Sequence, residues 1–83
     1  MKTILIENDE IKIMNDFTVI KKSNNNKYIL TKNLTLDNKK TDVISIFKII
    51  NDSYYDFINY FFLVDLNDLQ TILDYTTEYL GLE

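Results

Sequence analysis

The side chains of this chain that could do chemistry are carboxylates, lysines and tyrosines. The sequence contains no His and no Cys, so it lacks the commonest general base, the thiol nucleophile and nearly all zinc ligand sets. A single glycine cannot form a glycine-rich phosphate loop. A carboxylate-dependent hydrolase would need two acids facing one cleft, and the spacing of the acids places no such pair. We therefore predict that the protein is not an enzyme and uses no metal or cofactor.

Charge is divided unevenly along the chain. Residues 1–40 contain eight Lys and five acids, a balance of +3, whereas residues 41–83 contain one Lys and eight acids, a balance of −7. Such asymmetry bears on the choice of partner more than on the fold. It predicts that the second half of the chain presents an acidic surface.

Like charges repeat at a helical spacing within this acidic half. Asp52 and Asp56 are four residues apart, as are Asp74 and Glu78, and on a helix such pairs cost a few tenths of a kcal/mol. Tyrosine among carboxylates suits a Lys- or Arg-rich groove on a partner, although a solvated helix face would give the same pattern. The predicted partner-binding residues are Asp52, Asp56, Asp65, Asp68, Asp74, Tyr75, Glu78 and Tyr79.

Lysines in the first half raise nucleic-acid binding as an alternative. Phosphate contacts by Lys would give salt-dependent affinity, and Tyr28 lies among these lysines. The net charge of −4 and the lack of Arg argue against this role, and Lys on sheet edges also discourages aggregation. We therefore expect no direct nucleic-acid contact. The lysines concerned are Lys21, Lys22, Lys27, Lys32, Lys39 and Lys40.

The elements that position these residues begin with an antiparallel meander of three to four strands. Short β-branched runs separated by polar turns predict these strands. The runs are residues 2–7, 10–14, 17–22 and 27–36. Their connections are too short for the crossover helix that a parallel pair needs. Residues 8–16 could instead be a loop or a turn of helix, and residues 37–40 form a polar connection after the sheet.

Residues 42–63 carry the longest apolar pattern and are predicted to form one amphipathic helix, straight or kinked. At about 100° per residue, their apolar side chains fall within one arc of roughly 120°. The arc contains Val43, Ile46, Phe47, Ile50, Tyr54, Phe57, Ile58 and Phe61. Asn51-Asp52-Ser53 has poor helix propensity, but the apolar stripe stays in phase across it. Thr41 is the candidate N-cap, with Asp42 in the first turn.

A second helix is predicted from about residue 66 to residue 80. Asp65 followed three residues later by Asp68 resembles a capping arrangement. Gly81 lies where a glycine commonly ends a helix. The helix would therefore carry Asp74, Tyr75, Glu78 and Tyr79 on its outer face.

Together these elements predict an α+β fold of order ββββαα in a single domain, residues 1–83. The sheet over residues 1–36 would be covered on one face by a helical hairpin over residues 41–80. The longest apolar run, Tyr60 to Val64, is far shorter than the roughly 20 residues of a membrane-spanning helix. The chain also has no leader of the secretory kind. We therefore expect a soluble, cytoplasmic protein.

Two short segments resemble small acidic, phage-encoded anti-CRISPR proteins. NDLQTI at residues 67–72 is similar to a run in the last helix of the type II-A inhibitor that mimics DNA on its CRISPR nuclease. NKYIL at residues 26–30 is similar to the last strand of that inhibitor. The resemblance implies an inhibitor that binds a nuclease. That family begins with a helix and has an acidic loop where this chain has Phe62-Leu63-Val64, so no functional residue is carried over.

The leading hypothesis is a non-enzymatic inhibitor whose acidic helical face occupies a basic, nucleic-acid-binding surface of a protein partner, such as a CRISPR nuclease complex or a toxin. The lack of Ala, Arg and Pro with abundant Ile, Asn and Lys indicates an AT-rich coding sequence, as in many phages and mobile elements. An immunity protein or antitoxin would use the same electrostatics. Apolar residues outside the predicted stripe, Tyr55, Tyr60 and Phe62, leave a structural phage protein or a homodimer open.

Overall fold

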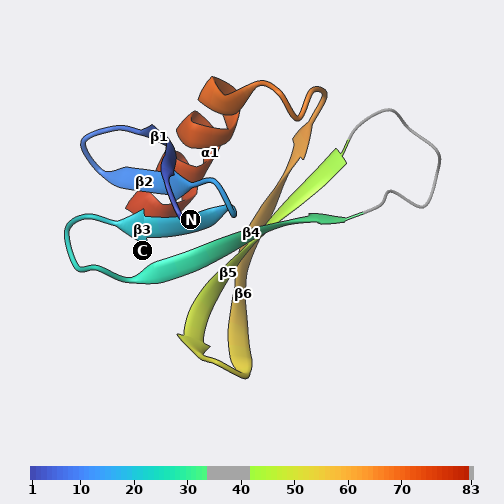
Figure 1. Cartoon of the computed structure of the whole chain (residues 1–83). Helices are drawn as coiled ribbons and strands as arrows, with labels where there is room; N and C mark the ends of the chain where they lie inside the picture. Colours follow the sequence, from blue (N-terminus) through green and yellow to red (C-terminus); the bar gives the residue numbers. More distant parts are fainter. Residues whose placement is uncertain (34–41, 83) are drawn as a thin grey trace.

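One antiparallel sheet dominates the molecule, and each of its strands pairs with its neighbours in the sequence (Figure 1). The structure, a computed structural model, describes residues 1–33 and 42–82. The strands in this part of the chain are β1 (Ile4–Glu7), β2 (Ile11–Met14), β3 (Thr18–Lys21), β4 (Lys27–Asn33), β5 (Asp42–Asn51) and β6 (Tyr54–Leu63). The helix α1 (Leu69–Gly81) follows the last strand.

Side-chain hydrogen bonds in the turns fix the first strands. The Asn8 side-chain oxygen accepts the backbone N–H groups of Glu10 and Ile11, each at 2.9 Å, and Asp16 accepts the N–H of Thr18 at 3.0 Å. Asn and Asp favour such turns because their short side chains hydrogen-bond nearby backbone. The strands predicted near the start of the chain agree with β1 to β4. The predicted extension through residues 34–36, the connection at 37–40 and the Thr41 cap lie outside the described residues.

The prediction of a helix over residues 42–63 is wrong, because this stretch forms the hairpin of β5 and β6. Asn51 makes the turn, since its side-chain oxygen accepts the N–H of Ser53 at 2.9 Å. β-branched and aromatic residues fill both strands, and these residue types fit a pleated surface better than a helix. The polar tripeptide at residues 51–53 is therefore a hairpin turn and not a tolerated defect in a helix.

Burial along the hairpin also departs from the predicted stripe. Ile46 and Phe61 are buried, whereas Ile50, Tyr54 and Phe57 are 50%, 57% and 52% exposed. The pairing contains a bulge: Ile46 pairs with Asn59 and Phe47 with Phe57, which leaves Ile58 without a partner. A bulge of this kind bends and twists its strand, and in Figure 1 the hairpin extends beyond the rest of the sheet as a twisted arm.

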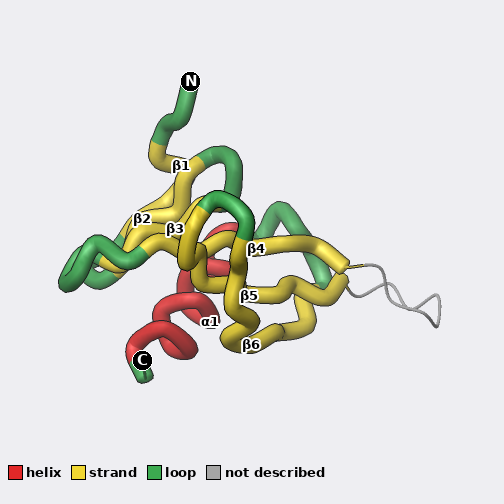
Figure 2. The backbone as a smooth tube through the Cα atoms, turned by 90° about the horizontal axis from the view of Figure 1, so that it is seen from below, coloured by secondary structure: helices red, strands yellow, loops and turns green. Residues whose placement is uncertain are grey.

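The helix α1 covers one face of the sheet (Figure 2). Its N-cap is Asp68, not Asp65, and Gly81 is its last residue, with Leu82 as the C-cap. The order ββββαα and a helical hairpin over residues 41–80 are therefore wrong, because the described chain has a six-stranded sheet and one helix. No helix in the described residues is long and apolar enough to cross a membrane.

The core lies between the sheet and α1. Its members are buried apolar side chains from five strands and the helix, namely Ile11, Ile13, Val19, Tyr28, Leu30, Ile44, Ile46, Phe61, Leu63, Ile72, Leu73 and Leu80. Two polar contacts fix the helix over the first strands. Asn8 donates from its side-chain nitrogen to Thr77 Oγ1 at 2.8 Å, and Lys21 Nζ donates to the carbonyl oxygen of Leu80 at 2.8 Å. The same helix reaches β6, where it meets the ring of Phe61.

Candidate protein-binding site

The two edges of the sheet differ in length. At one edge, β1 has 4 residues and an irregular pairing with β2. At the other edge, β6 has 10 residues, carries one charged side chain, Asp56, and contains no Lys. Natural sheets commonly protect their edges with short strands, lysines or bulges. The bulge at Ile58 therefore protects only part of β6, and the segment from Asn59 to Leu63 continues as regular edge strand beside α1.

A shallow groove of about 430 Å³ follows this segment of the edge. Its lining residues are Asn59, Tyr60, Phe61, Phe62, Tyr75 and Tyr79. Successive side chains of a strand point to opposite faces of a sheet, so a groove lined by Phe61 and by both of its neighbours runs along the strand edge. We call this feature the β6–α1 groove.

Aromatic contacts hold the helix side of the β6–α1 groove in place. The buried Phe61 ring lies 5.2 Å from the ring of Tyr75 and 6.3 Å from that of Tyr79, measured between centroids. The two tyrosine rings stack at 6.5 Å. Such pairs add about 0.5–1.5 kcal/mol to the burial of their area. Tyr75 and Tyr79 therefore form an ordered wall, although Tyr75 remains 38% exposed.

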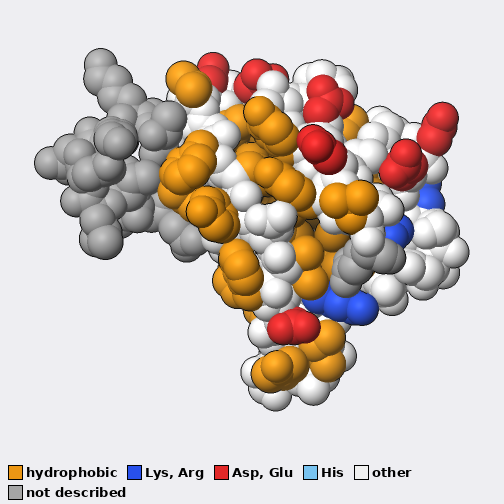
Figure 3. Space-filling view, turned by 180° about the vertical axis from the view of Figure 1, so that it is seen from behind, with side chains coloured by type: hydrophobic (Ala, Val, Ile, Leu, Met, Phe, Trp, Pro, Cys, Tyr) orange, Lys and Arg blue, Asp and Glu red, His pale blue; other side chains and the backbone are white. Residues whose placement is uncertain are grey.

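The opposite wall belongs to an aromatic stripe on the face of the sheet that α1 does not cover. Cross-strand partners share a face, and here Phe62 pairs with Val43, Tyr60 with Ser45, Phe57 with Phe47 and Tyr55 with Ile49. The stripe consists of Tyr55, Phe57, Tyr60 and Phe62, each about half exposed. Seen from behind, hydrophobic side chains run down the molecule toward the hairpin tip, with acidic side chains gathered above them (Figure 3).

The backbone of β6 at the groove has an unusual local partner. The N–H of Tyr60 donates to the side-chain oxygen of Asn59 at 2.8 Å, and so points away from β5. Along an antiparallel edge strand, every second residue directs its backbone N–H and C=O away from the neighbouring strand. The N–H and C=O of Phe62 therefore lie on the same outer edge as the N–H of Tyr60. Among the strands that the structure describes, none pairs with this edge.

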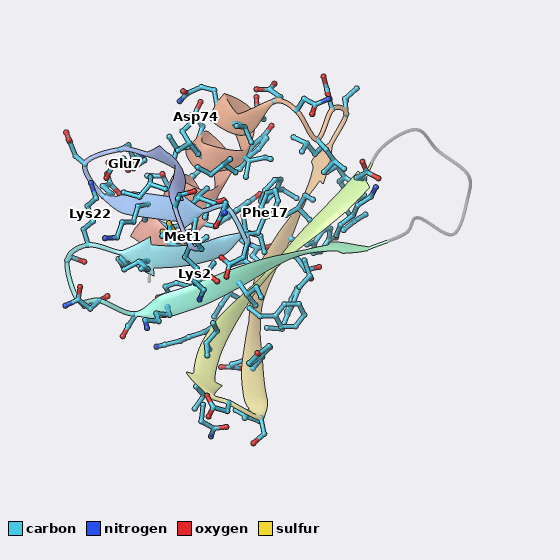
Figure 4. All side chains as sticks on the ribbon, in the orientation of Figure 1. Met1, Lys2, Glu7, Phe17, Lys22 and Asp74 are labelled. Atoms are coloured by element: carbon cyan, nitrogen blue, oxygen red, sulfur yellow. The ribbon has the colours of Figure 1, made fainter. Side chains whose placement is uncertain are left out.

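Four of the predicted site residues do come together on α1. Asp74 and Glu78 are exposed and lie one turn apart on the helix, each next in sequence to a tyrosine of the groove wall, but they do not line the groove themselves. Gln70 donates to Asp74 Oδ1 at 3.0 Å. Figure 4 shows Asp74 on the outer side of α1.

Asp65 and Asp68 extend the acidic surface to the start of α1. Asp65 accepts the N–H of Asn67 at 2.9 Å and shapes the turn before the helix. Asp68 accepts the Oγ1–H of Thr71 at 2.6 Å and the backbone N–H of Thr71 at 3.1 Å. These two hydrogen bonds lower the pKa of Asp68 below its ordinary value of 3.8, and the bond from the Thr71 side chain has the larger effect. Asp68 therefore remains ionised at neutral pH while it caps the helix.

No ion pair among the described residues neutralises the acids of α1. The ion pairs lie elsewhere and join Lys2 to Asp16 at 3.3 Å, Lys22 to Glu7 at 2.8 Å and Lys32 to Asp42 at 3.4 Å. The Glu7–Lys22 pair lies beside β1 and β2 (Figure 4). The sequence has no Lys or Arg after residue 48. Among the described residues, Asp74 and Glu78 therefore have no ion-pair partner, and no basic side chain lines the groove.

Asp52 and Asp56 do not belong to this acidic surface. Asp52 lies in the turn of the β5–β6 hairpin, and Asp56 lies on β6 opposite Lys48. Their four-residue spacing does not place them on one helix face, so that part of the prediction is wrong. The twisted arm holds them at the end of the hairpin that is distant from α1 (Figure 1).

The structure gives Lys21, Lys22 and Lys32 contacts within the fold, whereas Lys39 and Lys40 lie outside the described residues. Tyr28 is fully buried and is not positioned to stack on a base. Lys21 binds the last turn of α1, and Lys22 Nζ also donates to the carbonyl oxygen of Asn8 at 2.7 Å. Within the described residues, no group of three or more acidic side chains is placed to hold a metal ion.

Comparison with known proteins adds no family to these observations. The chain matches no protein-family model, no curated protein and no solved structure.

Tyr60 and Phe62 were predicted to lie outside the apolar stripe, whereas no role was predicted for Asn59. An Asn within an apolar run is a signal for a local backbone hydrogen bond. The Asn59 side chain can accept the N–H of Tyr60 only because β6 is an edge strand, where this N–H is not bonded to a neighbouring strand. The helical assignment of residues 42–63 therefore concealed it.

Proposed function

We propose that this chain is a non-enzymatic, protein-binding inhibitor, encoded by a phage or mobile element, that acts in the cytoplasm of its host. Its acidic surface on α1, beside the β6–α1 groove, occupies a basic, nucleic-acid-binding surface of the partner. The observation that carries this proposal is the uncompensated negative charge of Asp74 and Glu78 beside the exposed tyrosine wall.

Charge and shape support the same type of partner. Carboxylates on a rigid helix attract the Lys and Arg side chains that would otherwise contact phosphate. Tyr75 and Tyr79 add apolar contact and a face for cation–π interactions, and their packing on Phe61 limits the entropy lost on binding. CRISPR nuclease complexes and toxins are the partner classes to test first, since both classes include proteins with basic nucleic-acid-binding surfaces.

Replacement of Asp74 and Glu78 by Lys should weaken binding to such a partner. The full chain would be used to capture proteins from a nuclease-treated lysate of an AT-rich bacterium, with identification by mass spectrometry. We expect the unaltered chain to retain a nucleic-acid-binding protein at low salt, to release it at high salt, and to lose it to added duplex DNA. For the purified pair, Asp74→Lys with Glu78→Lys should weaken binding about tenfold or more at low salt.

A matched control reverses two acids outside the groove. Asp9→Lys with Asp52→Lys changes the net charge by the same amount, and both positions are exposed turn residues. We expect this variant to bind the partner nearly as well as the unaltered chain. If both double variants bind alike, the acidic surface of α1 is not the binding surface and the proposal fails.

A further inference from the structure

The segment of β6 beside α1 combines a regular edge strand, aromatic walls and negative charge. We propose that Asn59–Leu63 binds an extended segment of the partner as an additional strand, in which Lys or Arg alternates with apolar residues. This inference rests on the proposed function and specifies how the partner is held. In this mode of binding, the backbone of Asn59–Leu63 contacts the partner in addition to the side chains.

Backbone geometry supports strand addition at this place. The outward N–H and C=O groups of Phe62 offer one donor and one acceptor to an added strand, and the C=O of Tyr60 offers a second acceptor. The N–H of Tyr60 is held by the Asn59 side chain at 2.8 Å, a bond that an incoming carbonyl can replace. Edge strands that bind peptides in this way obtain affinity from the main chain and specificity from alternate side chains.

The two sides of the groove set the sequence pattern of the added strand. On the side of α1, side chains of the segment would meet Tyr75 and Tyr79, and the adjoining outer face of the helix carries Asp74 and Glu78, which favours Lys or Arg. On the other side they would meet the aromatic stripe at Phe62, which favours apolar or aromatic residues. Since strand side chains alternate, basic and apolar residues should alternate in the segment.

A second copy of this chain fits the edge less well. Antiparallel pairing of β6 with its own copy would place both α1 helices on one face of the joined sheet, next to each other across the two-fold axis. The exposed acids Asp74 and Glu78 of the two copies would then face each other, and β6 has no Lys to offset them. Like charges at an interface oppose association, so a basic segment is the favoured occupant.

The test begins with a library of short random peptides selected on the full chain at low salt. Enriched peptides should alternate Lys or Arg with apolar residues. One enriched peptide would then be synthesised and its affinity measured for Phe62→Ala and Phe62→Pro. Both substitutions remove the ring, but only proline removes the outward N–H, and an outward-facing edge position tolerates proline. We expect Phe62→Pro to bind about tenfold more weakly than Phe62→Ala.

Two further measurements separate strand addition from simple charge attraction. Hydrogen exchange should show that the peptide slows exchange of the Phe62 amide. Asn59→Ala, which frees the N–H of Tyr60, should bind the peptide at least as tightly as the unaltered chain. Circular dichroism of each variant would show that the fold persists.

Several results would overturn the inference. These are a lack of enriched peptides, enrichment without alternation, equal binding by Phe62→Ala and Phe62→Pro, or a homodimer in light scattering that Phe62→Pro abolishes. If partner capture still depends on Asp74 and Glu78 in any of these cases, the proposed function survives and only strand addition fails. If capture is also insensitive to these acids, both proposals fail.

Discussion

Asp68 has two roles at the scale of a single residue, because the carboxylate that caps α1 also contributes to its acidic surface. Its pKa is lowered by the hydrogen bonds from Thr71. A lowered pKa means that the folded protein binds this proton more weakly than the unfolded chain does. The ionised group therefore stabilises the fold above the ordinary pKa of 3.8, and this contribution is lost as the pH falls through the folded pKa.

Asp68→Asn should preserve the cap and remove this part of the pH dependence. Asparagine caps helices about as well as aspartate, so the midpoint of thermal unfolding at neutral pH should change little. Between neutral pH and about pH 3 the midpoint should fall less steeply than in the unaltered chain. Some decline should remain, because hydrogen bonds from Thr18 and Lys22 lower the pKa of Asp16 and Glu7, respectively. Equal slopes for the two proteins would contradict this assignment.

Individual site residues could be predicted from the sequence where the local signal sufficed. Asp68, Asp74, Tyr75, Glu78 and Tyr79 are positioned by one short helix, whose start is marked by capping residues and whose side-chain spacing is regular. The aromatic environment of the tyrosines could not be predicted, because it depends on Phe61 and therefore on a strand that sequence analysis assigned to a helix.

At the scale of elements, Phe61 joins β6 to α1. Its side chain is buried and contacts both tyrosines, whereas its neighbour Phe62 is 60% exposed on the other face. Phe61→Ala should lower the free energy of unfolding by about 3–5 kcal/mol, while Phe62→Ala should change it by no more than about 0.5 kcal/mol. Urea denaturation of the two variants measures the difference. Similar values for both would show that β6 is not oriented as described.

The β5–β6 hairpin could have been inferred from residue types but not from periodicity. Residues 42–63 contain many Val, Ile, Phe and Tyr residues, so apolar positions satisfy a helical arc and an alternating pattern at once. The bulge at Ile58 adds a shift that no regular period describes. The β-branched composition and the polar tripeptide Asn51-Asp52-Ser53 are the signals that favour two strands and a turn.

At the scale of the whole molecule, α1 links the two sides of the sheet. It is joined to the first strands through Thr77 and Leu80 and to β6 through Phe61. Loss of its packing should therefore destabilise the whole sheet, and not only the adjacent edge. The short connections between the first four strands correctly predicted their antiparallel order. The bridging position of α1 could not be predicted, because residues 42–63 were assigned to a helix and not to two strands.

Leu73→Ala tests this coupling. Leu73 is a buried residue of α1, and its truncation should lower the free energy of unfolding by about 2–5 kcal/mol. Transitions followed by tyrosine fluorescence and by circular dichroism should remain coincident. Leu82→Ala is the matched control, because Leu82 is exposed and its loss should cost little. Separate transitions in Leu73→Ala would show that the sheet and the helix unfold independently.

The pairing of sequence neighbours also determines when the molecule becomes colloidally stable during synthesis. Every strand can pair as soon as the next one is made, but the bond between Asn8 and Thr77 spans 69 positions, so α1 docks last. Residues 1–63 contain nine Lys and eight acids, a balance of +1, and a net charge near zero promotes association. The nascent sheet therefore lacks both its cover and its charge repulsion until the ribosome has made residues 64–83, which include α1 and contain five acids and no Lys.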